Sequence, residues 1–181
     1  MLDAAQQLVL DKGIGATSID DIASAAHVAK GTFYLYFPSK EALLRALQER
    51  FVAGFLERSE IAMDRCGPDR WRPKLQVWVK TLIEVYLDNV RLHDVIFHEV
   101  QPYDRDSMSN NPVIDQLTTL LGQGAQAGAW LAEEPRATAV MFFHALHGGV
   151  DAAIADSKNK VNRAKLIRRI TTFVERALHA T

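Results

Sequence analysis

The chain has 181 residues, 48% of them hydrophobic, which allows a packed core in one domain or in a small domain joined to a larger one. A formal net charge of −1 gives no overall basic excess, so charge alone does not indicate a nucleic-acid partner. One cysteine, no apolar run near the roughly 20 residues of a membrane span and no secretory signal together predict a soluble cytoplasmic protein.

The first segment predicts two helices separated by a glycine-containing turn. Gly13 is the type of residue that ends a helix. Thr17 and Ser18 each stand three residues before an aspartate, Asp20 or Asp21, which is a capping-box-like start for the second helix. Apolar residues recur at helical spacing before and after this turn, at Leu2, Ala5, Leu8, Val9, Ile19, Ile22, Ala23 and Ala26.

The rest of the chain also predicts helices. One begins near Lys30 and runs to Phe37, where Pro38 ends it, and Ser39 then caps a long helix from Lys40 to about Arg65. Glycine and prolines make residues 66–73 the clearest break. Further helices are predicted over 74–90, 92–100, 112–128, 134–156 and 161–179, with a polar loop over 101–112. Because no convincing strand is present, we predict an all-α fold with a three-helix head, a connecting helix and a helical body.

Residues 17–43 have the outline of a DNA-binding helix-turn-helix, in which the second helix enters the major groove. The first turn of that helix offers Lys30, Gly31 and Thr32. Lysine donates to guanine or phosphate, glycine allows close approach, and threonine offers a hydroxyl and a methyl group. Tyr34 and Tyr36 point away from the predicted buried face, so their hydroxyls are candidates for phosphate contacts.

Helix N-termini provide further candidate phosphate contacts, at Lys40 and at Thr17 and Ser18. Residues 1–45 nevertheless contain four Lys or Arg and five Asp or Glu residues, a net charge of −1, whereas DNA-binding proteins usually have a basic footprint. We hypothesise that a basic N-terminal arm of the natural protein precedes this chain. The alternative interpretation is a small three-helix subdomain with surface tyrosines.

The stretch TSIDDIASAAHVAKGTFYLYFPSKEALL, residues 17–44, resembles the TetR/AcrR family of bacterial transcriptional regulators. The resemblance is strong over about the first 45 residues and weaker beyond, where residues 124–150 are similar to the seventh and eighth helices of the family. It implies a helix-turn-helix DNA-binding domain over 1–45 and a helical ligand-binding and dimerisation domain over 46–181. Two departures are Ala29, where a serine often caps the recognition helix, and Leu35, at an exposed and often polar position.

The family resemblance implies a homodimeric repressor that binds a palindromic operator in double-stranded DNA and is released by a small effector. By position, the recognition-helix contacts are carried by Lys30, Thr32, Tyr34 and Tyr36, and the phosphate contacts by Thr17, Ser18 and Lys40. The residues leave open whether the protein represses or activates transcription.

The last two helices are predicted to form the dimer contact, because small residues in 134–156 allow close approach and the last helix has an apolar stripe. The alternative use of that stripe is an intramolecular core. The basic residues of the last helix are interpreted as a solvated outer face. A pocket for a lipophilic or aromatic effector is predicted on the middle helices. Its candidate residues are Trp78, Leu82, Tyr86, Phe97, His98, Trp130, Phe143, His144, His147 and Asp151.

Two other classes of function compete with a regulator. His144 and His147 share a helix face, and together with His98, or with His93 and Asp151, they form the alternative hypothesis of a metal- or haem-binding helical sensor. The main hypothesis requires no metal and no cofactor. The sequence contains no nucleophile–base pair, phosphate loop or paired-acid signature, so we do not expect an enzyme.

Overall fold

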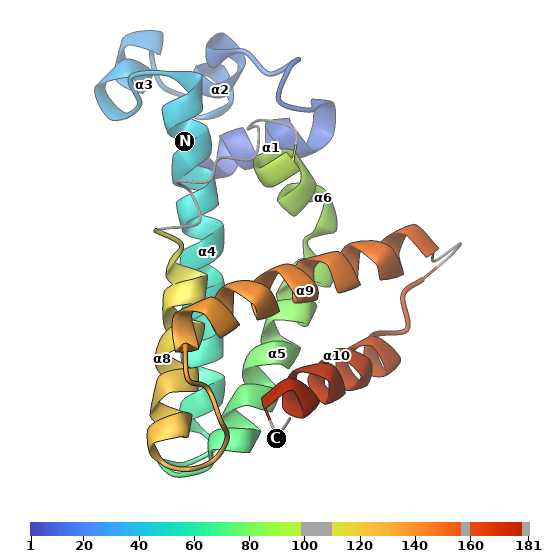
Figure 1. Ribbon diagram of the computed structural model, residues 1–181. Helices are drawn as coiled ribbons and strands as arrows, with labels where there is room; N and C mark the ends of the chain where they lie inside the picture. The colour runs from blue at the N-terminus through green and yellow to red at the C-terminus, as the bar shows by residue number, and fades with distance from the viewer. Residues whose placement is uncertain (99–109, 157–159, 179–181) are drawn as a thin grey trace. The chain divides into compact units, whose positions relative to one another are not determined.

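The computed structural model describes residues 1–98, 110–156 and 160–178, and these residues form helices without any strand among them (Figure 1). The predicted all-α class is confirmed. The helices are α1 (Leu2–Lys12), α2 (Ile19–Ala25), α3 (Lys30–Tyr36), α4 (Lys40–Asp64), α5 (Trp71–Asp88), α6 (Val90–His93), the π-helix η1 (Asp94–His98), α8 (Pro112–Gln126), α9 (Pro135–Asp156) and α10 (Arg163–Leu178). Most of the predicted loop over 101–112 lies outside the described residues.

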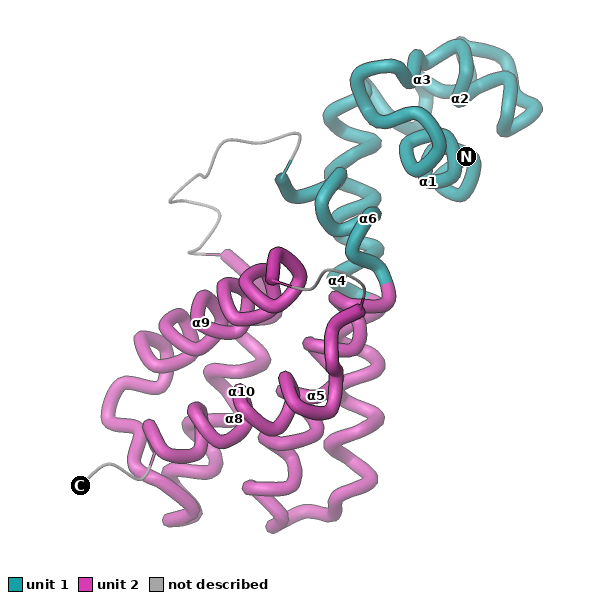
Figure 2. The backbone as a smooth tube through the Cα atoms, turned by 90° about the vertical axis from the view of Figure 1, so that its right-hand side faces the viewer, with its two compact units in different colours: residues 1–53, 89–104 teal, residues 54–88, 105–181 magenta. Residues whose placement is uncertain are grey.

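The chain divides into two compact units, shown in different colours in Figure 2. Unit 1 contains residues 1–53 and 89–104, and unit 2 contains residues 54–88 and 105–181. Helices α6 and η1 therefore belong with the N-terminal helices, although they follow α5 in the sequence. The proposed functional domains, 1–45 and 46–181, stay a prediction.

The core of unit 1 is built from helices of both of its segments. The π-helix η1 supplies one of the buried residues, and the side chain of Gln48 on α4 donates a hydrogen bond to the backbone oxygen of that same residue, Ile96. A residue far along the sequence therefore closes the core of the N-terminal helices. The buried members of this cluster are Ala5, Ile22, Phe33, Leu43, Leu44, Leu47 and Ile96.

Unit 2 is a bundle in which α5, α8, α9 and α10 contact one another. A partly buried polar link joins three helices: the Gln116 side-chain oxygen on α8 accepts from the Trp78 indole on α5 at 2.8 Å and from the Ser59 hydroxyl on α4 at 2.7 Å. The apolar stripe of α10 faces into the bundle. It therefore forms part of the intramolecular core, which the sequence analysis gave as the alternative to a dimer contact. The buried residues of this stripe are Leu166, Ile170, Val174 and Leu178.

Helix α9 is the one described helix that is long and apolar enough to be a candidate membrane span. Its mean hydropathy is 1.2 over an 18-residue window. Length and composition alone are weak evidence, because the core helix of a soluble bundle passes the same test. Helix α9 contacts α5, α8 and α10, and it carries Asp151 within its last two turns and Asp156 at its end, so we describe it as a bundle helix.

Candidate nucleic-acid interface and effector region

The α2–turn–α3 segment places one face of α3 in the core and leaves the opposite face in solvent. Phe33 is fully buried and anchors the helix. The three following residues are exposed, with relative accessibilities of 48% for Tyr34, 83% for Leu35 and 70% for Tyr36. Lys30 and Gly31 are also exposed, and Thr32 is partly buried. The candidate base-contacting residues thus lie together on a short helix whose outward face is accessible.

The first turn of α3 is tied to α2 by an ion pair. The Lys30 ammonium lies 2.9 Å from a carboxylate oxygen of Asp20, and this hydrogen bond raises the pKa of Lys30 above its ordinary value. Both side chains are more than half exposed, so salt and solvent screen the pair and a DNA phosphate can replace the carboxylate. Lys30 is therefore held at the surface in a position from which it can exchange partners.

The predicted capping box at the start of α2 is present. The Ser18 hydroxyl accepts from the backbone N–H of Asp21 at 3.1 Å, and the Asp21 carboxylate accepts from the backbone N–H of Ser18 at 2.8 Å. The same carboxylate lies 2.7 Å from the Lys12 ammonium. The hydrogen bonds from Lys12 and Ser18 hold the pKa of Asp21 far below its ordinary value of 3.8. The resulting stabilisation is present above about pH 3.8 and is lost as the pH falls toward the lowered pKa.

These pairs change how the net charge of the head is interpreted. Asp20 and Asp21 each have a lysine partner, and Asp3 lies 2.5 Å from the guanidinium of Arg50 on α4. The carboxylates near the candidate interface are therefore compensated locally, and the small negative net charge does not create an uncompensated acidic surface at those three positions.

The three predicted phosphate contacts at helix N-termini, Thr17, Ser18 and Lys40, all bond to other groups of unit 1. Thr17 is 1% exposed and its hydroxyl donates to the backbone oxygen of Gly13 at 2.7 Å, so the side chain turns inward and supports the turn between α1 and α2. The Lys40 ammonium donates to the backbone oxygen of Ile14 in the same turn. Ser18 is exposed. Among these three residues, Ser18 is the exposed one, while Thr17 and Lys40 hold the turn between α1 and α2.

We expect replacement of Ser18 by alanine to lower the free energy of unfolding by about 1 kcal/mol, because the cap of α2 loses its acceptor. Urea unfolding of the full chain at neutral pH measures the change. The matched control is Ser24→Ala, the same substitution on the exposed side of α2, where alanine is the better helix former. Equal stability of the two variants would contradict the capping role.

The candidate effector residues fall into separate groups, and the members of one group contact one another. Tyr86 on α5 donates its hydroxyl to the Asp151 carboxylate on α9 at 2.5 Å. The Tyr86 and His147 ring centroids are 5.7 Å apart, and those of Phe143 and His147 are 4.2 Å apart. His147 also donates through Nδ1 to the backbone oxygen of Phe143 at 2.9 Å. The structure thus brings four of the predicted residues together between α5 and α9.

The remaining candidates lie elsewhere. Trp78 and Trp130 are buried with their indole N–H groups bonded to Gln116 and to the backbone oxygen of Leu121, which is the pattern of core residues. Leu82 is buried on α5 and His144 is exposed on α9. Phe97 and His98 belong to unit 1, not to unit 2, and Phe97 packs against the core of unit 1.

Sequence reasoning missed Gln116, which accepts hydrogen bonds from two side chains of unit 2. Its only signal in the sequence is its position as a polar residue within the strongly amphipathic segment 112–126. The alternative metal site on His98, His144 and His147 draws its residues from both units, and it stays an untested hypothesis.

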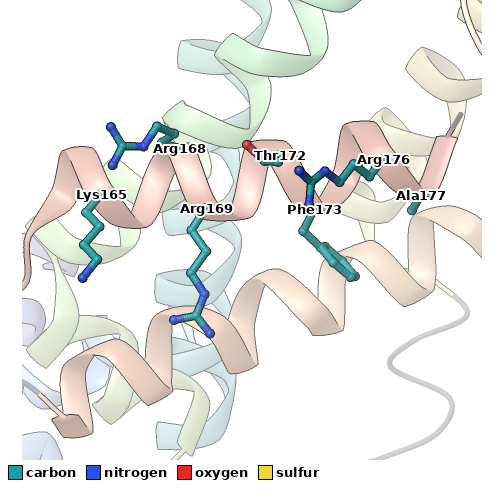
Figure 3. A pocket seen from close by; sticks show the side chains of 7 residues that line it. All are labelled: Lys165, Arg168, Arg169, Thr172, Phe173, Arg176 and Ala177. Carbon is teal, nitrogen blue, oxygen red and sulfur yellow. The ribbon is translucent and has the colours of Figure 1, made fainter.

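An open groove of about 700 Å³ runs along the outer side of α10 (Figure 3). Four cationic side chains and the exposed ring of Phe173 line it, so the basic residues of the last helix do form an outer face. The lining residues are Lys165, Arg168, Arg169, Thr172, Phe173, Arg176 and Ala177.

A helix-turn-helix head with an exposed second helix, in a chain that also has a separate bundle of long helices, defines the class of two-part DNA-binding transcriptional regulators. Residues 1–47 match the family described as bacterial regulatory proteins, tetR family, so this N-terminal part of the chain is the DNA-binding part of a TetR-family regulator.

The chain is 35% identical over 85 residues to the transcriptional regulator EthR of Mycobacterium tuberculosis, a match that covers 45% of this chain but only 39% of EthR. Among solved structures, the fatty acid degradation regulator FadR of Bacillus halodurans is 25% identical with a TM-score of 0.75, and the match covers 96% of this chain and 91% of FadR. FadR of Bacillus subtilis, solved with stearoyl-CoA, is 22% identical with a TM-score of 0.79 and coverages of 98% and 97%. These relatives are transcriptional regulators, in agreement with the expectation that the chain is not an enzyme.

Proposed function

We propose that the protein is a homodimeric transcriptional repressor that binds a palindromic operator through α2 and α3 and is released by a small lipophilic effector. The observation that carries this proposal is the TetR-family match of residues 1–47 together with the exposed outer face of α3. The residues proposed to contact base edges or phosphate are Ser18, Lys30, Gly31, Thr32, Tyr34, Tyr36 and Lys40. Thr17 supports them from beneath. Such a regulator works in the cytoplasm, where its operator is.

Tyr36 provides the clearest mutational test of operator binding, because 70% of its surface is accessible and truncation leaves the core of unit 1 intact. We expect Tyr36→Ala to weaken specific binding by about 1–3 kcal/mol if the side chain contacts a phosphate or a base. Gel-shift titration against DNA from the upstream intergenic region, over a salt series, measures this loss. Wild-type binding should fall steeply with salt.

Two further variants make the test specific. Tyr36→Phe removes only the hydroxyl, so it separates a phosphate hydrogen bond from contact by the ring. Leu131→Ala changes an exposed apolar residue of unit 2 and should bind the operator like the wild type. Unchanged binding by Tyr36→Ala would remove this residue from the interface. Absence of any specific shift for the wild-type chain would count against the proposed function itself.

The proposed effector is lipophilic, and a long-chain acyl-CoA is the first compound to test, because B. subtilis FadR was solved with stearoyl-CoA and matches nearly the whole chain. The proposed effector region is centred on Tyr86, Phe143, His147 and Asp151, which combine aromatic surface with a bonded polar pair. Stearoyl-CoA should release the operator in the gel shift, and coenzyme A without the acyl chain should not, because apolar burial supplies most of the binding energy.

The proposed dimer contact uses the outward sides of α9 and α10. Met141 and Phe173 are 61% and 52% exposed, and Ala145 and Gly148 are exposed small residues on α9. In a two-fold dimer the same patch meets its own copy, so cations at the centre of the contact would repel each other. We therefore infer that the apolar and small residues of α9 form the centre of the contact and that the cations of α10 lie at its rim.

A further inference from the structure

Three residues with metal-binding side chains lie together in unit 1, where α6 meets η1. One ligand atom from each of His93, Asp94 and His98 lies within 4.8 Å of the other two. Nδ1 of His93 is 3.9 Å from Oδ1 of Asp94, and the centroids of the two imidazole rings are 5.3 Å apart. These residues play no part in the proposed operator contacts or in the proposed effector region of unit 2.

The π-helical backbone is what brings the two histidines together. In an α-helix, residues five apart point roughly 140° away from each other around the axis. In a π-helix the hydrogen bonds run between residues five apart, so these residues lie one above the other. His93 is the last residue of α6 and His98 is the last residue of η1, so the two histidines are five residues apart. Single π-helical turns of this kind occur frequently at functional sites.

The first ligand is held in place by its surroundings, and the last one is accessible. His93 is 5% exposed, and its ring lies against Phe51 and Phe97, with centroid separations of 5.8 and 4.9 Å. His98 is exposed and Asp94 is partly exposed. Ligand atoms around a tetrahedral ion at about 2.0 Å stand about 3.3 Å apart, so binding draws the accessible His98 inward toward a fixed His93.

We propose that His93, Asp94 and His98 form a binding site for a divalent first-row transition-metal cation of the Zn²⁺, Co²⁺ or Ni²⁺ class. Two imidazoles and one carboxylate are the donor set that these ions prefer over Mg²⁺ or Ca²⁺, and three protein ligands leave a position for water or another ligand. The inference goes beyond the proposed function and does not depend on it. It also departs from the expectation that the chain binds no metal.

The site has a structural consequence within unit 1. Val95 and Ile96, which lie between the ligands, are buried, and Ile96 belongs to the same core cluster as Phe33 on α3. A cation that joins His93 to His98 fixes both ends of the turn that carries Ile96. If the folded protein binds the metal and the unfolded chain does not, binding stabilises the core that supports α3.

Metal binding to the full-length, tag-free protein, stripped with a chelator, tests the site directly. Co²⁺ is titrated by its visible absorbance, and Zn²⁺ by calorimetry and by the shift in melting temperature. We expect saturable binding by the wild type and at least about tenfold weaker binding by His98→Gln and by Asp94→Asn. Circular dichroism verifies that the variants are folded. The buried His93 is left unchanged, because its replacement would also disturb packing.

His144→Gln is the matched control, since it removes an exposed histidine of unit 2 and also tests the alternative metal set. It should bind Co²⁺ and Zn²⁺ like the wild type. The proposal is overturned by a wild-type protein that binds neither ion, by wild-type affinity in His98→Gln and Asp94→Asn, or by loss of binding in His144→Gln instead. Operator binding by the metal-free protein, measured in parallel, separates failure of this site from failure of the proposed function.

Discussion

Replacing Phe33 with alanine is expected to destabilise unit 1 by about 3–5 kcal/mol, whereas replacing Leu35 two residues later is expected to change stability by less than about 0.5 kcal/mol. Phe33 is 0% exposed and lies at the centre of the unit 1 core, while Leu35 is 83% exposed on the same helix. Truncation of Phe33 leaves a cavity, and α3 has no other fully buried side chain to replace that anchor. Because domains are stable by only about 5–15 kcal/mol, most of the stability of this small unit is lost.

Urea unfolding of the full chain, followed by circular dichroism, measures both stabilities, and a gel shift measures operator binding. Phe33→Ala should lose specific DNA binding together with the fold of unit 1. Leu35→Ala should stay folded, so any loss of affinity in it reports a direct apolar contact with DNA, such as one to thymine methyl groups. Two variants of equal stability would show that the assignment of buried and exposed faces of α3 is wrong.

Gly124→Ala should destabilise unit 2, although alanine in a helix normally stabilises. A Cβ at this position would lie 2.0 Å from Cζ2 and 2.4 Å from Cε2 of Trp130, whose buried ring rests on the helix backbone. Either the indole moves, which breaks its 2.8 Å hydrogen bond to the backbone oxygen of Leu121, or α8 shifts. Overpacking of this kind costs about 1–3 kcal/mol or more, which exceeds the gain of about 1 kcal/mol in helix propensity.

The neighbouring Gly122→Ala is the control for this prediction. Its nearest neighbour would be Pro135 at 3.8 Å, an ordinary van der Waals contact, so the variant should gain up to about 1 kcal/mol. Thermal unfolding followed by tryptophan fluorescence compares the two variants with the wild type. Stabilisation by both substitutions would mean that Trp130 does not occupy the position against Gly124 in solution.

Local sequence signals predicted the head well, because they act over a few residues. Gly13 ends α1 with a φ of 77°, Ser18 and Asp21 form the capping box of α2, and α4 begins just after Pro38 and Ser39. Each of these devices depends on backbone groups within one helical turn, so residue identity and spacing are sufficient. The helices of the body were likewise predicted to within a few residues from their periodicity.

The candidate effector residues show what local sequence signals cannot predict, namely which helices pack against each other. Helical spacing predicted that large aromatic residues lie on inward faces, but it could not say which faces meet. Tyr86, His147 and Asp151 come together only because α5 packs against α9, while Phe97 and His98 belong to the other unit. The predicted set therefore mixed one real cluster with core tryptophans and with residues of unit 1.

The amino-acid sequence by itself determined the all-α class, the helix-turn-helix and the exposed face of α3, since these depend on periodicity, caps and the alternation of buried and exposed positions along single helices. Only the tertiary structure decided that η1 completes the core of the head, that Gln116 joins α4, α5 and α8, and that His93 and His98 lie together. The physical reason is that these features depend on the assembled core. Residues far apart in the chain become packing partners only in the folded protein, and packing stabilises the π-helical turn, so neither feature can be predicted from neighbouring residues.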